Sequence, residues 1–262
     1  MRVILRWSKT IMSGHSHWAG IRYKKAALDA KRGRLWSKLA RNIIAAAKTG
    51  GGDPAANLSL RYAIDKAKDA NMPKDSIEKA VKRGTGALEG AHYEEITYEG
   101  YGCHGVAVMC EVLTDNRNRT AGELRHIFEK KGGSLGAAGC VAWMFKKKGL
   151  FTVPAHAVQE DNLMDIAIDA GADDVELTDD AYEITCSLEN YENLKKTLKE
   201  NEIETKVAEI SQVPSSYITL DKDASRKILD LMETLEDHDD VQNVYANFDI
   251  PPETLKQIEA EN

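Results

Sequence analysis

Apolar residues between positions 34 and 48 recur every three or four residues, which is the period of one face of an α-helix. The stripe consists of Leu35, Trp36, Leu39, Ala40, Ile43, Ile44 and Ala47. It predicts an amphipathic helix over 34–48, inside a longer helical stretch at 24–49 with Gly33 as a candidate break.

Two more helices are predicted directly after this one. Three glycines at 50–52 end the first helix, and we expect Asp53 to cap a second helix that begins at Pro54 and ends near Ala70. A turn at 71–73 separates it from a short helix over 74–83, which Gly84 stops. The first third of the chain is therefore expected to be all-helical.

Beyond Gly90 the period changes to that of β-strands. Within 149–212 the order is strand 150–153, helix 160–170, strands 175–177 and 182–187, helix 191–199 and strand 204–210. This β-α-β-β-α-β order is ferredoxin-like. The flanking segments repeat it with strands 106–113, 141–145, 217–220 and 241–248 and helices 119–131 and 224–236, and a further strand is expected at 95–99.

The sequence thus predicts a multidomain α and α+β protein, in which a helical domain precedes two ferredoxin-like α+β domains, one inserted in the other. The expected boundaries are 13–90 for the helical domain, 91–148 plus 213–250 for the outer α+β domain, and 149–212 for the acidic inserted one. One larger mixed sheet is the alternative. We interpret 1–12 as a disordered or non-native extension, with translation starting at Met12.

The charge of the chain is strongly segregated. Residues 1–86 carry 19 Lys and Arg against 6 Asp and Glu, whereas 150–262 carry 8 against 28, so the net charge of −7 is a misleading average. A phosphate backbone samples the nearest surface rather than the mean charge. The basic segment therefore predicts contact with nucleic acid.

Four cations of this segment fall on one side of the predicted helix. Arg34, Lys38, Arg41 and Lys48 lie within an arc of about 80°, opposite the apolar stripe. No acidic residue lies between Lys31 and Lys48, and an ordinary solvated helix would usually mix in glutamate. The row is expected to contact phosphates, with a plain amphipathic surface helix as the alternative.

Two other places add candidate contacts. His15 and His17 flank a serine beside Trp18, which suits base stacking; a metal pair lacks a third ligand nearby, and an ordered loop is the structural alternative. Arg117 and Arg119 lie at a strand-to-helix junction, where either anion binding or helix capping is expected. The full set of predicted nucleic-acid contacts is His15, His17, Trp18, Arg22, Lys24, Lys25, Lys31, Arg32, Arg34, Lys38, Arg41, Lys48, Arg117 and Arg119.

Enzyme chemistry finds little support. The stretch 100–105 matches G-x-G-x-x-G, but a β-branched run follows instead of a helix, so we interpret it as a connection between strands. The acidic runs at 173–174, 179–180 and 236–240 are expected to be solvated. The four cysteines show no C-x-x-C spacing and are expected to be reduced thiols. We expect no catalytic residues, no metal and no cofactor.

Several motifs together resemble the YebC family, over Met12 to about Asp249. They are Gly14-His-Ser-His-Trp-Ala19, Asp29-Ala-Lys-Arg-Gly33, Gly50-Gly-Gly-Asp-Pro-Ala-Ala-Asn57, Asn71-Met-Pro73, Tyr98-Glu-Gly-Tyr-Gly102, Thr114-Asp-Asn-Arg-Asn-Arg-Thr120 and Gly132-Gly-Ser-Leu-Gly136. His17 replaces the lysine that is common in the first motif. The resemblance implies a helical domain plus two α+β domains and no enzymatic activity. It also implies either DNA-binding transcriptional regulation or action on the ribosome during synthesis of proline-rich segments.

The expected function is that of a non-enzymatic nucleic-acid-binding regulator of gene expression, leaning to the ribosome or ribosomal RNA, with a DNA-binding transcriptional regulator as the alternative. We expect a monomer without a membrane segment, since no run approaches the roughly 18 apolar residues that span a bilayer. A cytoplasmic location is expected, or the mitochondrial matrix if residues 1–11 belong to a transit peptide.

Overall fold

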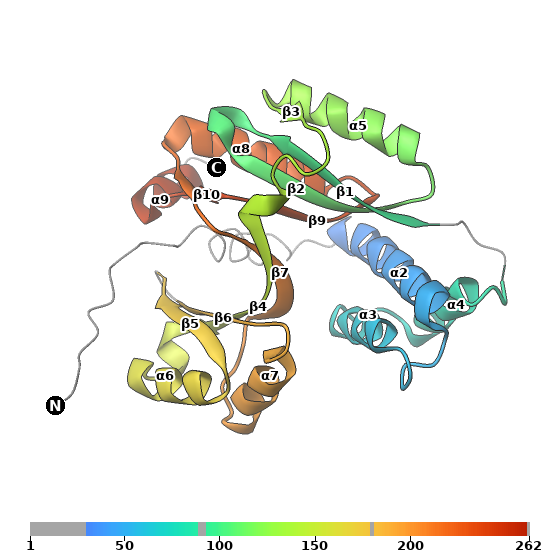
Figure 1. Cartoon of the computed structure of the whole chain (residues 1–262), viewed down its shortest axis with the longest axis horizontal. Helices are drawn as coiled ribbons and strands as arrows, with labels where there is room; N and C mark the ends of the chain where they lie inside the picture. Colours follow the sequence, from blue (N-terminus) through green and yellow to red (C-terminus); the bar gives the residue numbers. More distant parts are fainter. Residues whose placement is uncertain (1–29, 89–92, 179–180, 261–262) are drawn as a thin grey trace. The chain divides into compact units, whose positions relative to one another are not determined.

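A computed structural model of the chain describes residues 30–88, 93–178 and 181–260 (Figure 1). The described residues divide into two compact units. The N-terminal unit comprises 30–142 and 224–245, and the C-terminal unit comprises 143–223 and 246–260. None of the described helices is both long enough and apolar enough to cross a membrane.

Three helices open the N-terminal unit: α2 (Ala30–Gly50), α3 (Leu58–Asp69) and α4 (Lys74–Gly84). The predicted apolar stripe of α2 forms a core with α3 and α4, to which Leu39, Ile43, Leu60 and Ile77 contribute. Helix α2 continues through Gly33, so the candidate break there is wrong. At Gly84 a side chain would lie 2.5 Å from the carbonyl oxygen of Ile44, so glycine lets α4 approach α2 closely.

The start of α3 corrects one prediction. Asn57, not Asp53, is the N-cap, because its side-chain oxygen accepts a hydrogen bond from the backbone N–H of Leu60. The amide group of Asn57 also donates to the carbonyl oxygens of Ala46 and Gly51, both at 2.8 Å. These bonds hold the chain at Asn57, and the stretch after Asp53 forms a turn instead of the first helical turn.

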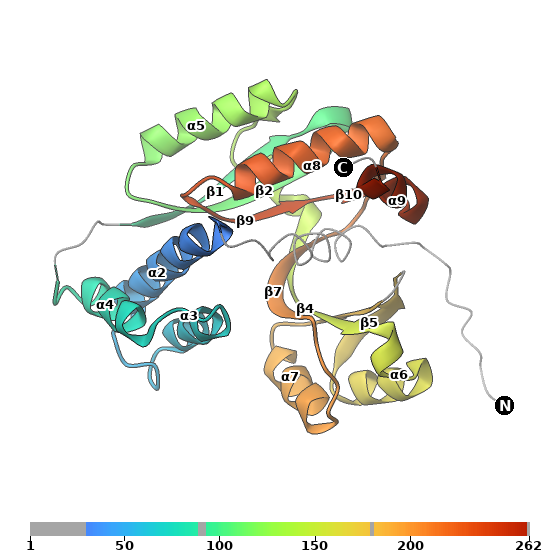
Figure 2. The same cartoon turned by 180° about the vertical axis from the view of Figure 1, so that it is seen from behind.

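A four-stranded sheet in the order β3-β1-β2-β9 completes the N-terminal unit. Its strands are β1 (Glu94–Tyr101), β2 (Ala107–Thr114), β3 (Ser134–Leu135) and β9 (Val241–Ala246). Helices α5 (Arg117–Lys130) and α8 (Lys222–Glu236) cover the same face of this sheet (Figures 1 and 2). A short 3₁₀ turn, η1 (Cys103–Gly105), joins β1 to β2, in agreement with the interpretation of the glycine motif as a connection between strands.

The membership of this sheet differs from the prediction. Residues 142–144 form a 3₁₀ helix, η2 (Ala142–Met144), and not a strand at 141–145. The predicted strand 217–220 is reduced to β8 (Ile218–Thr219), which pairs in parallel with β10 (Phe248–Asp249). Strand β1 instead lies between β2 and β3, the place of the third strand in a ferredoxin-like sheet. An alternating pattern indicates that a segment is a strand but does not identify the strands with which it pairs. The position of β1 in the sheet could therefore not be predicted from the pattern.

The C-terminal unit contains the second ferredoxin-like arrangement. Its elements are β4 (Phe145–Pro154), η3 (Ala155–Ala157), α6 (Glu160–Asp169), β5 (Ala172–Leu177), β6 (Ala181–Cys186), α7 (Tyr191–Glu200) and β7 (Val207–Pro214). The sheet order is β5-β6-β4-β7, and all three pairings are antiparallel. Helices α6 and α7 bury one face with Leu163, Leu194 and Leu198 against Phe151 and Ile184. Helix α9 (Pro252–Ala260) ends the described chain.

The fold class is therefore confirmed as a helical domain followed by α+β domains with ferredoxin-like sheets. The exact cuts at 148/149 and 212/213 stay a prediction. The ladder between β4 and β7 begins at Phe145 and Pro214, so both strands pass through the expected cuts without interruption.

Candidate nucleic-acid interface

The middle of the predicted cation row lies against the loop that follows α8. The ammonium group of Lys38 donates to the carbonyl oxygen of Glu236 at 2.5 Å, and the guanidinium of Arg41 donates to the carbonyl oxygen of Asp239. Arg41 also pairs with the carboxylate of Asp240 at 3.1 Å. These two cations of α2 are therefore engaged by backbone and carboxylate oxygens of the same chain.

Lys38 is largely enclosed at this contact. Burial lowers its pKa from 10.5 to about 8, although the nearby carboxylates of Glu236, Asp237 and Asp239 act in the opposite direction. Lys38 therefore loses its proton, and with it its charge, at a lower pH than an exposed lysine does.

Asp240 is the centre of a cluster of hydrogen bonds, which we call the Asp240 cluster. Its side chain is only 5% exposed. One oxygen accepts from Arg119 at 2.6 Å, from Thr120 at 2.7 Å and from Thr114 at 3.1 Å, and the other accepts from Arg41. Burial by itself would raise the pKa of Asp240, but the bonds from Arg119 and the two threonines outweigh it and hold the pKa below 3.8.

The Asp240 cluster joins four elements by one carboxylate. Arg41 comes from α2, Thr114 from the end of β2, and Arg119 and Thr120 from the first turn of α5. Asp240 itself directly precedes β9, and its carbonyl oxygen accepts from the backbone N–H of Leu113 at 2.8 Å. The expectation that the acidic run 236–240 is solvated is wrong at Asp240, since the two arginines and two threonines compensate its burial.

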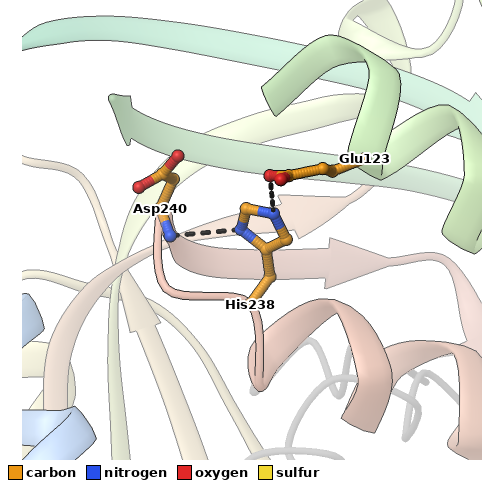
Figure 3. A group of neighbouring side chains, drawn as sticks. All are labelled: Glu123, His238 and Asp240. Carbon is orange, nitrogen blue, oxygen red and sulfur yellow. Dashed lines mark hydrogen bonds and ion pairs between the residues drawn. The ribbon is translucent and has the colours of Figure 1, made fainter. Parts of the chain in front are cut away.

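A histidine and a glutamate stand beside this cluster (Figure 3). The Nε2 atom of His238 lies 2.9 Å from the carboxylate of Glu123, and its Nδ1 accepts from the backbone N–H of Asp240 at 3.1 Å. Ligand atoms of Glu123, His238 and Asp240 lie within 4.8 Å of one another, which is a spacing that a metal ion could use. However, both ring nitrogens of His238 are engaged in hydrogen bonds, and the Asp240 carboxylate points away from the ring (Figure 3).

The surroundings do not suit a cation. Two guanidinium groups, those of Arg41 and Arg119, already contact Asp240, and a metal ion would have to displace them. The group lines a surface pocket of about 800 Å³ with residues of both signs: Arg41, Asp115, Arg119, Glu123, His126, Ile127, Asp237, His238, Asp239 and Asp240. We assign no metal to it and interpret these residues as a structural network.

The junction before α5 is used for capping. Asn116 is the N-cap, and its side chain accepts from the backbone N–H of Arg119 at 3.1 Å. The guanidinium of Arg119 pairs with Asp115 at 3.0 Å as well as with Asp240. Arg117 is exposed. Of the two predicted arginines, only Arg117 therefore presents its side chain to solvent without an ion pair among the described residues.

Of the remaining predicted contacts, only Lys48 has a side chain among the described residues. Lys48 is exposed at the end of α2. Lys31, Arg32 and Arg34 belong to α2, but their side chains lie outside the described residues. The predicted contacts between positions 1 and 29 also lie outside them: His15, His17, Trp18, Arg22, Lys24 and Lys25.

Helices α3 and α4 carry further exposed cations, which lie outside the predicted set: Arg61, Lys66, Lys68, Lys74, Lys79, Lys82 and Arg83. Lys68 pairs with Asp65 and Lys74 with Glu78, both as exposed intrahelical contacts that are worth little. The signal was present in the charge count, because residues 30–88 hold 13 Lys and Arg against 5 Asp and Glu. Acidic residues are interspersed among these cations, whereas the row on α2 has none, so no unbroken row of cations marks α3 and α4 in the sequence.

The geometry defines a class of protein, a cationic helical domain joined to two ferredoxin-like α+β domains. Comparison with known families identifies which one. Residues 16–87 match the model for the TACO1/YebC protein N-terminal domain, and residues 93–248 match that for the TACO1/YebC second and third domain. The chain belongs to the TACO1/YebC family, as its motifs indicated.

Individual relatives agree over nearly the whole chain. A probable transcriptional regulatory protein of Dictyoglomus thermophilum is 54% identical over 248 residues, which are 94% of this chain and 100% of that protein. One from Rhodopirellula baltica is 50% identical over 247 residues, with the same coverage. The crystal structure of a conserved hypothetical protein from Aquifex aeolicus is 47% identical and superimposes with a TM-score of 0.80, covering 90% of this chain and 97% of that one.

Proposed function

We propose that this protein is a non-enzymatic, nucleic-acid-binding regulator of gene expression that acts on the ribosome or its RNA and assists synthesis of difficult, proline-rich segments. The observation that supports it is the excess of cations on the helical domain, many of them exposed on α3 and α4. Such a surface attracts phosphates irrespective of sequence. We propose further that the protein is located in the cytoplasm and is a monomer.

The contacts of α2 support the choice of RNA over DNA. Reading a base sequence in the major groove needs an element, most often a helix, whose side chains reach the base edges. On α2 most of the stripe packs into the core, although Leu35 is exposed, and Lys38 and Arg41 on the other side contact the loop 236–240. A folded RNA can be bound by shape and phosphate contacts without such a helix.

DNA-binding transcriptional regulation is the second candidate. It is favoured by the names of the relatives, which call them probable transcriptional regulatory proteins. The two candidates share the need for a cationic surface but differ in the required selectivity. Specific DNA should bind roughly 10³-fold or more tighter than random DNA at physiological salt.

The test compares ribosomes with DNA in one buffer at ~150 mM salt. We expect the protein to co-sediment with ribosomes and to bind promoter and random DNA with similar, weak affinity. Replacing Lys82 and Arg83 of α4 by glutamine should weaken ribosome binding and lower its salt slope by about one per lost phosphate contact. In a purified translation system, adding the protein should speed passage through a run of prolines.

The matched control carries the same change of charge elsewhere. Lys199 and Lys206 are exposed in the C-terminal unit, and their replacement by glutamine should leave ribosome binding unchanged. Strong preference for one promoter, without retention on ribosomes, would make the transcriptional function primary. Equal losses in both double variants would mean that only net charge matters and would remove α4 from the interface.

A further inference from the structure

A tryptophan stands open to solvent at the start of the C-terminal unit. Of the large apolar side chains that are exposed in the described ranges, Trp143 is the most open, at 74% of its surface. Single exposed apolar residues are common, so this exposure carries weight only if the position is ordered and its neighbours point to a ligand. Both conditions are met.

The backbone that carries Trp143 is fixed on either side. Val141 and Phe145, two residues before and two after, are buried at 0% and 7% exposure. The backbone N–H groups of Val141 and Ala142 each donate to the carboxylate of Glu99 at 2.7 Å. The carbonyl oxygen of Met144 accepts from the backbone N–H of Ser215, also at 2.7 Å. The ring is therefore presented by an anchored turn, η2, and not by a frayed end.

Glu99 is an effective anchor because it stays charged. It also accepts from the backbone N–H of Gly139 at 2.6 Å. Burial alone would raise its pKa, but the three backbone donors together lower the pKa below its usual value. The segment that leads into Trp143 is thus held by three charge-assisted hydrogen bonds.

Cations follow the tryptophan immediately. Lys146 and Lys147 are exposed at the start of β4, and chain length alone keeps them within about 14 Å of Trp143. Lys148 pairs with Asp173 at 3.0 Å, so its charge is already compensated. No acidic residue occurs between 141 and 148. The local charge is therefore positive within a unit that is acidic as a whole.

We propose that the segment Trp143–Lys147 binds unpaired nucleotides of RNA. The indole stacks on a base, and Lys146 and Lys147 contact the adjoining phosphates. An aromatic platform beside cations is how proteins bind single strands without reading their sequence, since every base offers a π-face. A base pair inside a duplex hides these faces, so a single strand is the partner that fits. This inference rests on the proposed function and adds a second contact, outside the helical domain.

The first experiment replaces the ring. Binding of a labelled, unstructured oligouridylate to the full chain is measured at ~150 mM salt by fluorescence anisotropy. Trp143→Ala should weaken binding between about 5-fold and 100-fold, as expected for one lost base stack. Trp143→Phe keeps a stacking ring and should stay within about 3-fold of the parent. Ile168→Ala, at another exposed apolar residue (61%), is the control and should have no effect.

The second experiment removes the cations. Replacing Lys146 and Lys147 by glutamine should reduce the slope of log affinity against log salt by about 1.4, since each phosphate contact on a single strand contributes roughly 0.7. The double variant of Lys199 and Lys206 changes the net charge equally and should keep the parent slope. Circular dichroism spectra and melting curves establish that all variants are folded.

Three results would overturn the proposal. They are unchanged oligouridylate affinity of Trp143→Ala, equal losses for Trp143→Ala and Trp143→Phe, and preference for a duplex of the same length. Ribosome co-sedimentation of the parent protein distinguishes failure of the Trp143 site from failure of the proposed function. A parent that stays on ribosomes but binds oligouridylate without needing Trp143 leaves the function standing and removes this site. A parent that does neither overturns both.

Discussion

At the scale of single residues, Asp240 decides how several elements meet. Its carboxylate accepts from Arg41, Arg119, Thr114 and Thr120, yet it belongs to an acidic run that looks solvated in the sequence. What makes it different from Asp239, one position earlier, is only that the end of β2 and the start of α5 surround it. No local pattern carries that information.

Replacing Asp240 by asparagine should lower the free energy of unfolding by about 1.5–3 kcal/mol, as for lost hydrogen bonds to a charged group. The partly exposed arginines keep the effect below that of a fully buried ion pair. Since the folded-state pKa of Asp240 is lowered, the stability that it contributes is present above the unfolded pKa and is lost as the pH falls through the folded one. Urea unfolding at pH 7 and near pH 3 measures both effects, and the gap between parent and variant should narrow in acid.

The control for this prediction is Asp239→Asn, which changes the same charge at an exposed side chain. It should cost less than about 0.5 kcal/mol. A loss of stability equal to that of Asp240→Asn would mean that the loop charge matters and the hydrogen bonds do not.

At the scale of elements, the helices and strands were largely predictable. The apolar stripe of α2 is the face that packs on α3 and α4, and helices predicted at 160–170 and 191–199 match α6 and α7 closely. The wrong predictions concern the residue at which an element begins and the strand with which another strand pairs. The predicted strand at 141–145 is wrong because buried Val141 and Phe145 flank a 3₁₀ turn. All five residues are apolar, and periodicity in so short an apolar run does not distinguish a strand from a helical turn.

The start of α3 offers a test at this scale. Replacing Asn57 by alanine removes the cap on Leu60 and the two bonds to Ala46 and Gly51, so we expect a loss of about 2–3 kcal/mol of stability. Asp53→Ala removes only an exposed bond to the backbone N–H of Ala55 and should cost less than about 1 kcal/mol. Thermal or urea unfolding of the two variants gives the comparison, and a larger cost at Asp53 would restore the cap that the sequence suggested.

At the scale of the whole molecule, the ferredoxin-like sheet of β4–β7 has its own strands, helices and core. We therefore predict that the fragment 145–214 folds alone, and that a chain in which a short Gly/Ser linker joins Lys148 to Val213 keeps a folded remainder. Near-UV circular dichroism and cooperative melting of both products are the measurements. A remainder with near-native secondary structure but without near-UV signal would show that the two parts stabilise each other and that the nested description is wrong.

The sequence by itself determined the class of each segment, because helical and strand periods and turn residues act over short distances. It also determined the cationic character of the helical domain and, through its motifs, the family. Only the tertiary structure decided that β1 takes the third place in its sheet, that Lys38 and Arg41 contact a loop almost 200 residues away, and that Asp240 is buried. These outcomes depend on which distant surfaces pack together, and a side chain's partners across such separations leave no periodic trace in the chain.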